Sequence, residues 1–369
     1  MFYNFLHMDF NTLFLLIKEY PILIIAIILV VAVVFINGWT DAPNAIATCV
    51  STKAIKPKFA VLMAAIFNCL GVISMFFLSK ATSETIANMV DFGDHYETAL
   101  YALSAGMIGV VVWGILAWSI GIPSSESHAL IAGITGAGLA AMTLGISGVK
   151  IHFGPTSSWA FTLYGLILSC VFGFVIGYLV TRLIQLICYK MNRNKTRPFF
   201  KVAQIFSGAA MAYVHGAQDG LKFLGVLLLA INLAYNAKFG ASESSFVISN
   251  SEWYIALIIA LIMGLGTSLG GYRIIKKVGM GMVSLETYEG FATDITSAIG
   301  IFLSTFFGIP VSTTQVKSFA ILGVGATKGV KHIKWSVVKE MLLTWVFTFP
   351  GCGIIGYVFA LIFIKIFGG

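Results

Sequence analysis

Long apolar runs follow one another along the chain, separated by short polar connectors. The runs are 21–36, 59–79, 99–120, 129–146, 159–187, 199–214, 221–233, 253–269, 295–307, 318–324 and 337–367. Of the 369 residues, 58% are hydrophobic and 10% are charged, whereas soluble proteins carry about 25% charged residues. So little charge cannot cover a water-facing surface. The sequence therefore predicts an all-α, polytopic membrane protein with roughly eight to twelve membrane segments of about 20 residues.

Basic residues gather in short clusters between the apolar runs. The clusters are 53–58, 182–201, 273–277 and 328–339. Acidic connectors lie elsewhere, at 84–97 and 243–252. Because cytoplasmic loops are enriched in Lys and Arg, we expect a multi-pass protein of the cell membrane with its basic loops in the cytoplasm. The net charge of +8 comes from these loops, so the expected partner is the lipid bilayer and not nucleic acid; a homo-oligomer is left open.

Two polar motifs each occur twice, in the same order. Residues 37–44 (NGWTDAPN) align with 215–222 (HGAQDGLK), and residues 121–128 (GIPSSESH) align with 308–315 (GIPVSTTQ). The first motif precedes the second by 84 residues in one half (37 to 121) and by 93 in the other (215 to 308). Two matches in the same order at similar spacing predict an internal repeat.

The charge pattern gives the two halves opposite orientations. With the basic clusters inside, the first motif lies on a run that enters from outside, whereas its second copy lies on a run that enters from inside. We therefore predict one transmembrane domain over 1–369 with two inverted-topology repeats, and residues 1–20 either span or lie on the membrane. Its parts are repeat one at about 21–150, a central crossing and basic cytoplasmic loop at about 158–201, repeat two at about 199–335, and a C-terminal hydrophobic segment at 336–369.

Each motif places polar residues and helix breakers within an apolar stretch. A straight helix over 21–52 would be about 48 Å long at 1.5 Å per residue, and Gly38 and Pro43 are natural break points. Broken or re-entrant helices are tolerated at membrane depth only where they face protein or a watery cavity. Interrupted segments at corresponding positions of inverted repeats predict the binding site of a transporter.

Asp41 and Asp219 occupy equivalent positions in the two copies of the first motif. A charge within a membrane is costly and usually functional, so we interpret both carboxylates as partners of a coupling ion, Na⁺ or H⁺. The alternative is that each only caps a helix. The predicted cation-coupling residues are Asp41, Asp219, Asn37, Thr40, Asn44, Gln218 and Glu126. No other metal site and no organic cofactor is predicted.

Hydroxyl groups follow the Gly-Ile-Pro sequence in each half. Hydroxyls and backbone N–H groups at the start of a helix form a cradle for an anion, and a tetrahedral oxyanion suits a site rich in neutral donors. The alternative is simple N-capping. The predicted substrate-binding residues are Ser124, Ser125, Ser127, Ser312, Thr313, Thr314 and Lys222.

Three titratable residues have more than one interpretation. Glu126 can bind the coupling ion, accept a hydrogen bond from a protonated oxyanion, face a watery vestibule, or pair with Lys317. Lys222 can contact the anion or neutralise Asp219, and the second is favoured. His215 is equally well a hydrogen-bonded core histidine.

At these residues the chain resembles the PiT family of inorganic phosphate transporters. Residues 37–48 (NGWTDAPNAIAT) are similar to its GxxDxANAxAT signature, and 215–222 to its HGxNDxQK type; 266–273 and 308–314 are further family-like stretches. The resemblance covers about 35–345. It implies a cation-coupled symporter of inorganic phosphate with inverted repeats and both termini outside. It also implies that the two aspartates serve the cation and the Ser/Thr clusters serve phosphate.

The chain departs from the family pattern at three positions, and other functions compete. The family often has Asn at Gln218, His at Gln315, and Ser or Thr at Glu126. A sulfate permease of the same family is therefore an alternative, as is an anion channel. An enzyme is not predicted, because no P-loop, HExxH or GxSxG motif occurs, and His215 with Asp219 would lack a third metal ligand.

Overall fold

The structure is a computed structural model that describes residues 10–120, 124–240 and 252–367, so residues 121–123 of the first Gly-Ile-Pro motif and Glu243 lie outside the described residues. The described residues form helices, and the all-α prediction is confirmed for them. The helices are α1 (Phe10–Glu19), α2 (Ile22–Thr40), α3 (Ala42–Ser51), α4 (Pro57–Leu78), α5 (Ala81–Ala87), α6 (Tyr96–Ile120), α7 (Glu126–Thr143), α8 (Ser158–Ile187), α9 (Arg193–Phe239), α10 (Trp253–Ser268), α11 (Tyr272–Gly281), α12 (Thr287–Phe306), α13 (Thr313–Ala326), the short 3₁₀ helix η2 (Val330–His332) and α14 (Trp335–Phe367).

Six helical stretches among the described residues are long and apolar enough to cross a membrane. They are Ile22–Ser51, Pro57–Leu78, Tyr96–Ile120, Ser158–Ile187, Arg193–Phe239 and Trp335–Phe367. This is fewer than the expected eight to twelve segments, because several apolar runs form short helices. With 14 residues, α13 is about 21 Å long and cannot span a hydrocarbon core of about 30 Å. The runs 199–214 and 221–233 also merge into the single helix α9.

The backbone breaks at only one of the two copies of the first motif. α2 ends at Thr40 and α3 begins at Ala42, so the interruption falls at Asp41, between the expected break points. The second copy lies within α9 without interruption. Proline explains the difference, since the ring of Pro43 removes a backbone donor and crowds the preceding turn, and the second copy contains no proline.

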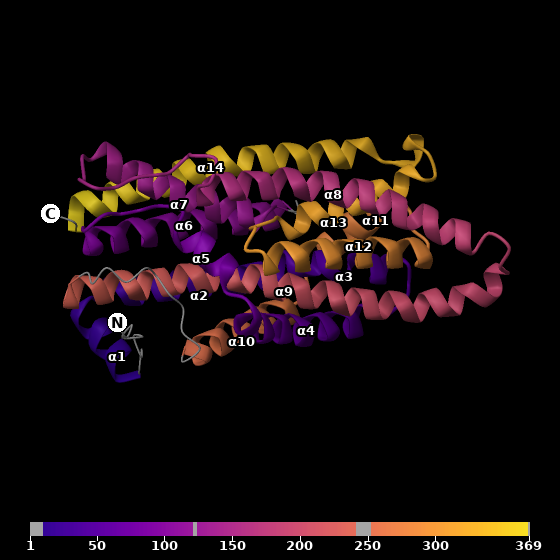
Figure 1. The fold of residues 1–369 in the computed structure, drawn as a ribbon, viewed down its shortest axis with the longest axis horizontal. Helices are drawn as coiled ribbons and strands as arrows, with labels where there is room; N and C mark the ends of the chain where they lie inside the picture. Colours follow the sequence, from indigo (N-terminus) through magenta and orange to yellow (C-terminus); the bar gives the residue numbers. More distant parts are fainter. Residues whose placement is uncertain (1–9, 121–123, 241–251, 368–369) are drawn as a thin grey trace.

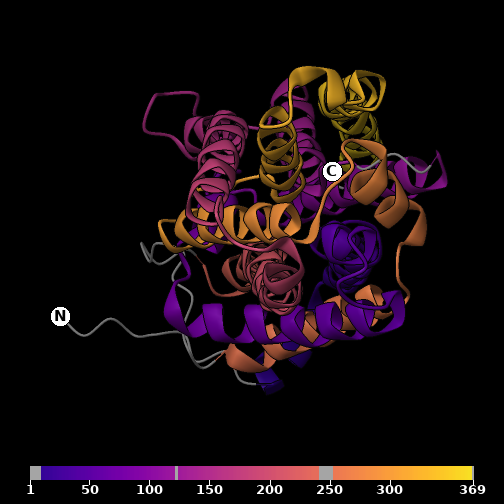
Figure 2. The same ribbon diagram turned by 90° about the vertical axis from the view of Figure 1, so that its right-hand side faces the viewer.

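Equivalent helices of the two halves make equivalent contacts. α4 packs against α9, and its counterpart α10 packs against α2; α7 packs against α14, and its counterpart α13 packs against α8. In the same way α5 contacts α9 and α11 contacts α3. Each half therefore reaches across onto the other, as the interleaved colours in Figure 2 show. The contact pattern extends the equivalence to α8 and α14, which the sequence placed outside both repeats.

The helices that carry the two copies of the first motif run in opposite directions along the length of the molecule. The start of α2 lies beside the end of α9, where Lys238 pairs with Glu19. The end of α3 lies beside the early part of α9, where Thr52 Oγ1 donates to Gln204 Oε1 at 2.8 Å. In Figure 1 α1 and the end of α14 lie at the left-hand end and the α8–α9 turn at the right-hand end. The first motif thus sits on antiparallel helices in the two halves.

All four basic clusters gather at the right-hand end of Figure 1, which we call the basic end. Arg193 pairs with Glu286, the N-cap of α12, at 2.6 Å, and Lys328 pairs with Glu289 in the first turn of α12 at 2.6 Å. Lys277 reaches the start of α14, and Lys53 lines the same cavity as Arg193. Apolar sides with the basic clusters at one end are the pattern expected of a chain that has lipid around its sides and water at its ends.

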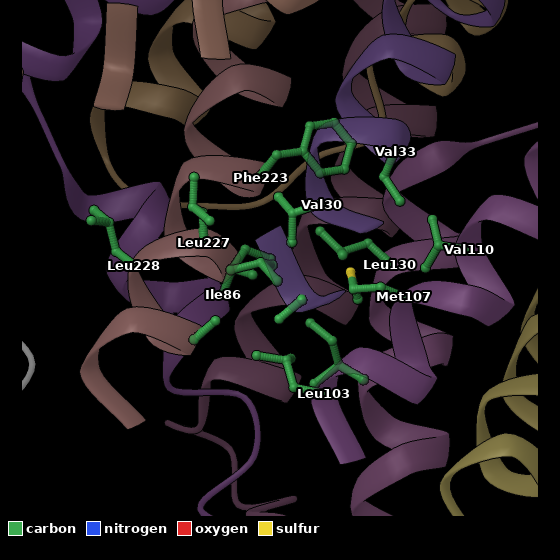
Figure 3. Packing of buried hydrophobic residues seen from close by; sticks show 14 of the residues in the cluster. Val30, Val33, Ile86, Leu103, Met107, Val110, Leu130, Phe223, Leu227 and Leu228 are labelled. Atoms are coloured by element: carbon green, nitrogen blue, oxygen red, sulfur yellow. The ribbon is translucent and has the colours of Figure 1, made fainter. Parts of the chain in front are cut away.

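The largest apolar core lies where α2, α6, α7 and α9 meet (Figure 3). Val30, Met107, Leu130 and Phe223 contribute to it, one from each of these helices. Elsewhere the helices touch through glycine: a Cβ on Gly71 of α4 would lie 1.9 Å from the carbonyl oxygen of residue 213 in α9. Such close backbone approach is typical of helix packing in membranes, and it brings the two halves together around the centre.

Candidate functional site

The motifs of the two halves meet in the centre of the molecule. Asp41 lies at the α2–α3 break, Asp219 in the middle of α9, and Thr313 in the first turn of α13. The Thr313 hydroxyl lies 3.4 Å from Asp41 Oδ2 and 3.3 Å from Asp219 Oδ2, so it can donate to either. Both carboxylates are buried, with exposed fractions of 3% and 1%. Two acidic groups in one dry cluster repel each other unless cations compensate them.

Short side chains from α3 and α13 hold the Asp41 carboxylate. Asn44 Nδ2 donates to Asp41 Oδ1 at 2.5 Å and also approaches the Thr314 hydroxyl at 3.3 Å. The Thr314 hydroxyl donates to the same carboxylate oxygen. The amide oxygen of Asn44 is buried and has no hydrogen-bond partner among the described residues. It is therefore free to act as a cation ligand.

Asp219 is held by one lysine and one amide. Lys222 Nζ lies 2.8 Å from Asp219 Oδ1, and Asn37 Nδ2 donates to Asp219 Oδ2 at 3.2 Å. The same ammonium group donates to the Ser127 hydroxyl and to the carbonyl oxygen of Val311, both at 2.6 Å. Lys222 therefore neutralises Asp219, as favoured from the sequence, and also contacts Ser127, one of the hydroxyl residues that follow Gly-Ile-Pro.

His215 joins this cluster, together with two further buried polar residues, Asn68 and Thr267. Its Nε2 atom lies 3.4 Å from Asp219 Oδ2, and its Nδ1 atom lies 3.0 Å from Asn68 Oδ1. Asn68 in turn donates to the Thr267 hydroxyl at 3.1 Å. The only sequence signal for Asn68 was a polar side chain inside an apolar run, whereas Thr267 lies in the family-like stretch 266–273. Ligand atoms of Asp41, His215 and Asp219 all lie within 4.8 Å of one another. Asp41 thus completes a group of three candidate metal ligands, of which only His215 and Asp219 were paired from the sequence.

The two hydroxyl turns face each other. Ser125 and Ser312 are the N-caps of α7 and α13, and each accepts a hydrogen bond from the backbone N–H three residues on. Their hydroxyl oxygens lie 2.7 Å apart. Ser127 donates to the Val311 carbonyl oxygen at 3.3 Å, and Ser124 is also buried. The two serines thus cap their helices and also face each other, so the positive ends of two helix dipoles point at the same region.

Three predicted cation-coupling residues, Thr40, Glu126 and Gln218, bind groups other than the two aspartates. The Thr40 hydroxyl lies 3.5 Å from Glu126 Oε1, while Glu126 Oε2 is buried without a partner among the described residues. The predicted pairing of Glu126 with Lys317 is not formed, because Lys317 pairs with Asp294 instead. Gln218 donates to the carbonyl oxygen of residue 309 at 3.3 Å and accepts from a hydroxyl of α12, so it holds the α12–α13 turn.

The site offers oxygen atoms for a hard cation and hydroxyl donors for an anion. Buried oxygens without a hydrogen-bond partner among the described residues include those of Asn37, Asn44 and Glu126. Unwound backbone and half-helix termini around such groups are typical of transporter sites. Thr313 and Thr314, expected among the anion donors, place their hydroxyls on the aspartates. The cation and anion residues therefore form one connected cluster.

Comparisons with known proteins show which proteins the chain is similar to. The sequence profile of the phosphate transporter family matches residues 37–356. The chain is 35% identical over 349 residues to a probable low-affinity inorganic phosphate transporter of Bacillus subtilis, with 94% of this chain and 99% of that protein covered. A protein of the same description from Mycobacterium leprae is 36% identical over 337 residues, with 91% and 77% covered.

A solved structure shares the fold. It is titled "The sodium-dependent phosphate transporter", and it matches with a TM-score of 0.81 at 22% identity, over 94% of this chain and 100% of that one. The family profile covers both halves of the chain and every motif around the central cluster. The chain belongs to the phosphate transporter family.

Proposed function

We propose that this protein is a secondary active transporter, a symporter that carries inorganic phosphate across the cell membrane together with Na⁺. The observation that supports this most is the meeting of Asp41 and Asp219, from two different halves, on the hydroxyl of Thr313 in a buried centre. The relatives are described as inorganic phosphate transporters. The substrate leaves the protein chemically unchanged.

The charges of the central cluster provide the reason for coupling. Two aspartates face a single lysine, Lys222, so the cluster without further cations repels an anion. Sodium ions on the carboxylates, with the free amide oxygens of Asn37 and Asn44 as further ligands, would reverse this. Phosphate would then bind at the facing N-termini of α7 and α13. Because each ion lowers the electrostatic cost of the other, their affinities must rise together.

Glu126 supports phosphate over sulfate as the substrate. Its Oε2 atom is a buried acceptor without a partner among the described residues. Phosphate near neutral pH keeps a proton that it can donate to such an atom, whereas sulfate has none. A buried acceptor that stays unpaired disfavours the anion that cannot satisfy it. A large excess of sulfate is therefore expected to leave phosphate uptake unchanged.

Uptake of radiolabelled phosphate into proteoliposomes tests the proposal. Accumulation above the external concentration, driven by an imposed Na⁺ gradient and abolished when an ionophore collapses that gradient, supports symport. Accumulation driven by a pH gradient alone would replace Na⁺ with H⁺ as the coupling ion. Equilibration without accumulation under either gradient would show an anion channel and contradict the proposal.

The capping serines give the anion site a graded test. Ser125→Ala and Ser312→Ala each remove one hydroxyl donor, and a hydrogen bond is worth about 0.5–1.5 kcal/mol, or more with a charged acceptor. We expect the phosphate concentration for half-maximal uptake to rise roughly 3- to 30-fold, at about 1.4 kcal/mol per tenfold. The effects should be less than additive, because the two hydroxyls are in contact. Unchanged values in both variants would show that these hydroxyls only cap helices.

The orientation of the molecule is tested by thiol labelling. We propose that the basic end is cytoplasmic and both termini are outside, from the charge asymmetry. Single cysteines at Asn194 and Lys331, at the basic end, should react with an impermeant reagent only from the cytoplasm. A cysteine at Asp94, in the acidic connector, should react only from outside. Labelling of positions 194 and 94 from the same side would contradict the orientation.

A further inference from the structure

A second buried cluster of charges lies beside the central site. Lys317 of α13 and Asp294 of α12 form an ion pair with no exposed side-chain surface. Thr48 of α3 joins them: its hydroxyl donates to Asp294 Oδ1 at 2.6 Å and accepts from Lys317 Nζ at 3.1 Å. Buried ion pairs add little net stability over apolar packing, and ionisable residues at membrane depth are functional by default. None of these three residues belongs to the central cluster.

The cluster lies on a polar stripe along α3. Asn44, Thr48 and Thr52 are spaced by four residues and so share one helical face. Asn44 approaches Thr314 in the central site, and Thr52 donates to Gln204 on α9 at 2.8 Å. From the first to the last of these residues the helix advances about 12 Å. The stripe therefore leads from the central site, past the ion pair, towards the basic end.

At its far end the stripe reaches a cavity. The cavity has a volume of about 620 Å³, and Thr52, Lys53, Arg193 and Arg197 contribute to its lining. Basic side chains around a cleft raise the local concentration of anions. An anion that left the central site along α3 would meet Lys317 first and these basic residues next.

The stripe is closed between the site and the cavity. Asn44, Thr48 and Gln204 are all buried. The walls are in contact, because a Cβ on Gly208 of α9 would lie 2.4 Å from the sulfur of Cys49 on α3. The buried Lys317–Asp294 pair lies beside this stripe, and through Thr48 it joins α3 of the first half to α12 and α13 of the second.

We propose that the Lys317–Asp294 pair, with Thr48, is the gate through which phosphate passes between the central site and the basic end. The inference rests on the proposed function of phosphate symport. Movement of one half against the other separates the pair from Thr48, because both members of the pair belong to the second half and Thr48 belongs to the first. The ammonium group of Lys317, released from Thr48 and from the carbonyl oxygen of Ala45, then faces an anion that moves along the neutral side chains of α3.

Native cysteines allow a test without altering the gate. Cys49 is fully buried and its sulfur lies 3.4 Å from Asp294 Oδ2. Cys352 is equally buried but lies against α7, where its thiol donates to the carbonyl of Ala129, away from the stripe. Wild-type proteoliposomes are treated with a small methanethiosulfonate reagent, with and without Na⁺ and phosphate, and labelling at each cysteine is measured by peptide mass spectrometry.

Transport conditions are expected to speed labelling of Cys49 at least about tenfold, a shift of ~1.4 kcal/mol in opening, and to leave Cys352 unchanged. Equal acceleration at both cysteines would indicate general loosening and contradict the gate. Continued protection of Cys49 while phosphate is taken up would contradict it as well. Absence of uptake under any gradient would instead refute the proposed function, so the two failures are distinguishable.

A paired substitution separates a gate from a structural ion pair. Asp294→Leu with Lys317→Met removes both charges and fills the same space, so we expect phosphate to bind with wild-type affinity while uptake falls by roughly tenfold or more. The matched control is Lys277→Met with Glu340→Leu, which removes a pair at the surface of the basic end and should leave uptake unchanged. Wild-type uptake in the first double variant would overturn the gate. Loss of phosphate binding would do so too, because it would place the pair in the binding site.

Discussion

Replacing either buried aspartate by asparagine is expected to abolish cation-driven phosphate uptake. Asp41→Asn and Asp219→Asn keep the shape of the side chain but remove the charge that compensates a bound cation. A loss of at least about 100-fold, equivalent to ~2.7 kcal/mol, should bring the initial rate in proteoliposomes to that of empty liposomes. An asparagine oxygen still accepts a hydrogen bond from the Thr313 hydroxyl, so the expected defect comes from the lost charge.

The two asparagine variants should differ in stability. Asp219→Asn leaves the buried ammonium group of Lys222 without its carboxylate, so its thermal unfolding midpoint should fall. Asp41 has no lysine partner among the described residues, so Asp41→Asn should unfold near the wild-type temperature. The control is Asp94→Asn in the connector before α6, with uptake as in wild type. Normal gradient-driven uptake by both central variants would favour a capping role for the carboxylates.

Lys222→Met is expected to cause the second large loss. The substitution leaves Asp219 buried without its cation, and breaking a buried ion pair in this way costs about 3–5 kcal/mol. The anion site also loses the ammonium group that contacts the Ser127 hydroxyl. We expect uptake to fall by more than about 100-fold, equivalent to ~2.7 kcal/mol, together with a lower unfolding temperature. Uptake near the wild-type rate would remove Lys222 from the site.

Two further variants separate stability from transport at Lys222. Lys222→Met combined with Asp219→Leu removes both charges, so it should regain stability while uptake stays absent. Lys238→Met breaks only the pair with Glu19 near the end of α9, and such pairs contribute about 0–1 kcal/mol. Its uptake and unfolding temperature should match the wild type. Recovery of uptake in the double variant would show that the charges serve folding alone.

The sequence predicted the parts of the site that lie in repeated motifs. Asp41 and Asp219 stood out because each is a charge in an apolar run, and the paired Gly-Ile-Pro motifs identified the capping serines. Proline marked the helix break in the first motif, whereas its absence from the second copy explains why α9 continues through it. Local chemistry of this kind can be read from neighbouring residues in the chain.

Contacts between distant segments could not be predicted in the same way. Asn68 reaches His215 across 147 residues, and Thr48 reaches Asp294 across 246. His215 and Thr48 lie in recognisable motifs, but their partners Asn68 and Asp294 lie in no motif, so the sequence did not indicate either pairing. From the sequence, the site residues were divided into a cation set and an anion set. In the structure, the hydroxyls of Thr313 and Thr314 from the anion set contact Asp41 of the cation set. Only packing of the two halves brings these groups together.

Binding of phosphate to the purified protein at varied Na⁺ concentrations tests the central claim most directly, because it measures coupling without transport. If one buried cluster holds both ions, Na⁺ must raise the affinity for phosphate, and phosphate must raise the affinity for Na⁺ by the same factor. We predict this reciprocal increase in the wild type and its loss in Asp41→Asn. A phosphate affinity that is the same at every Na⁺ concentration and every pH would contradict a shared, cation-coupled site.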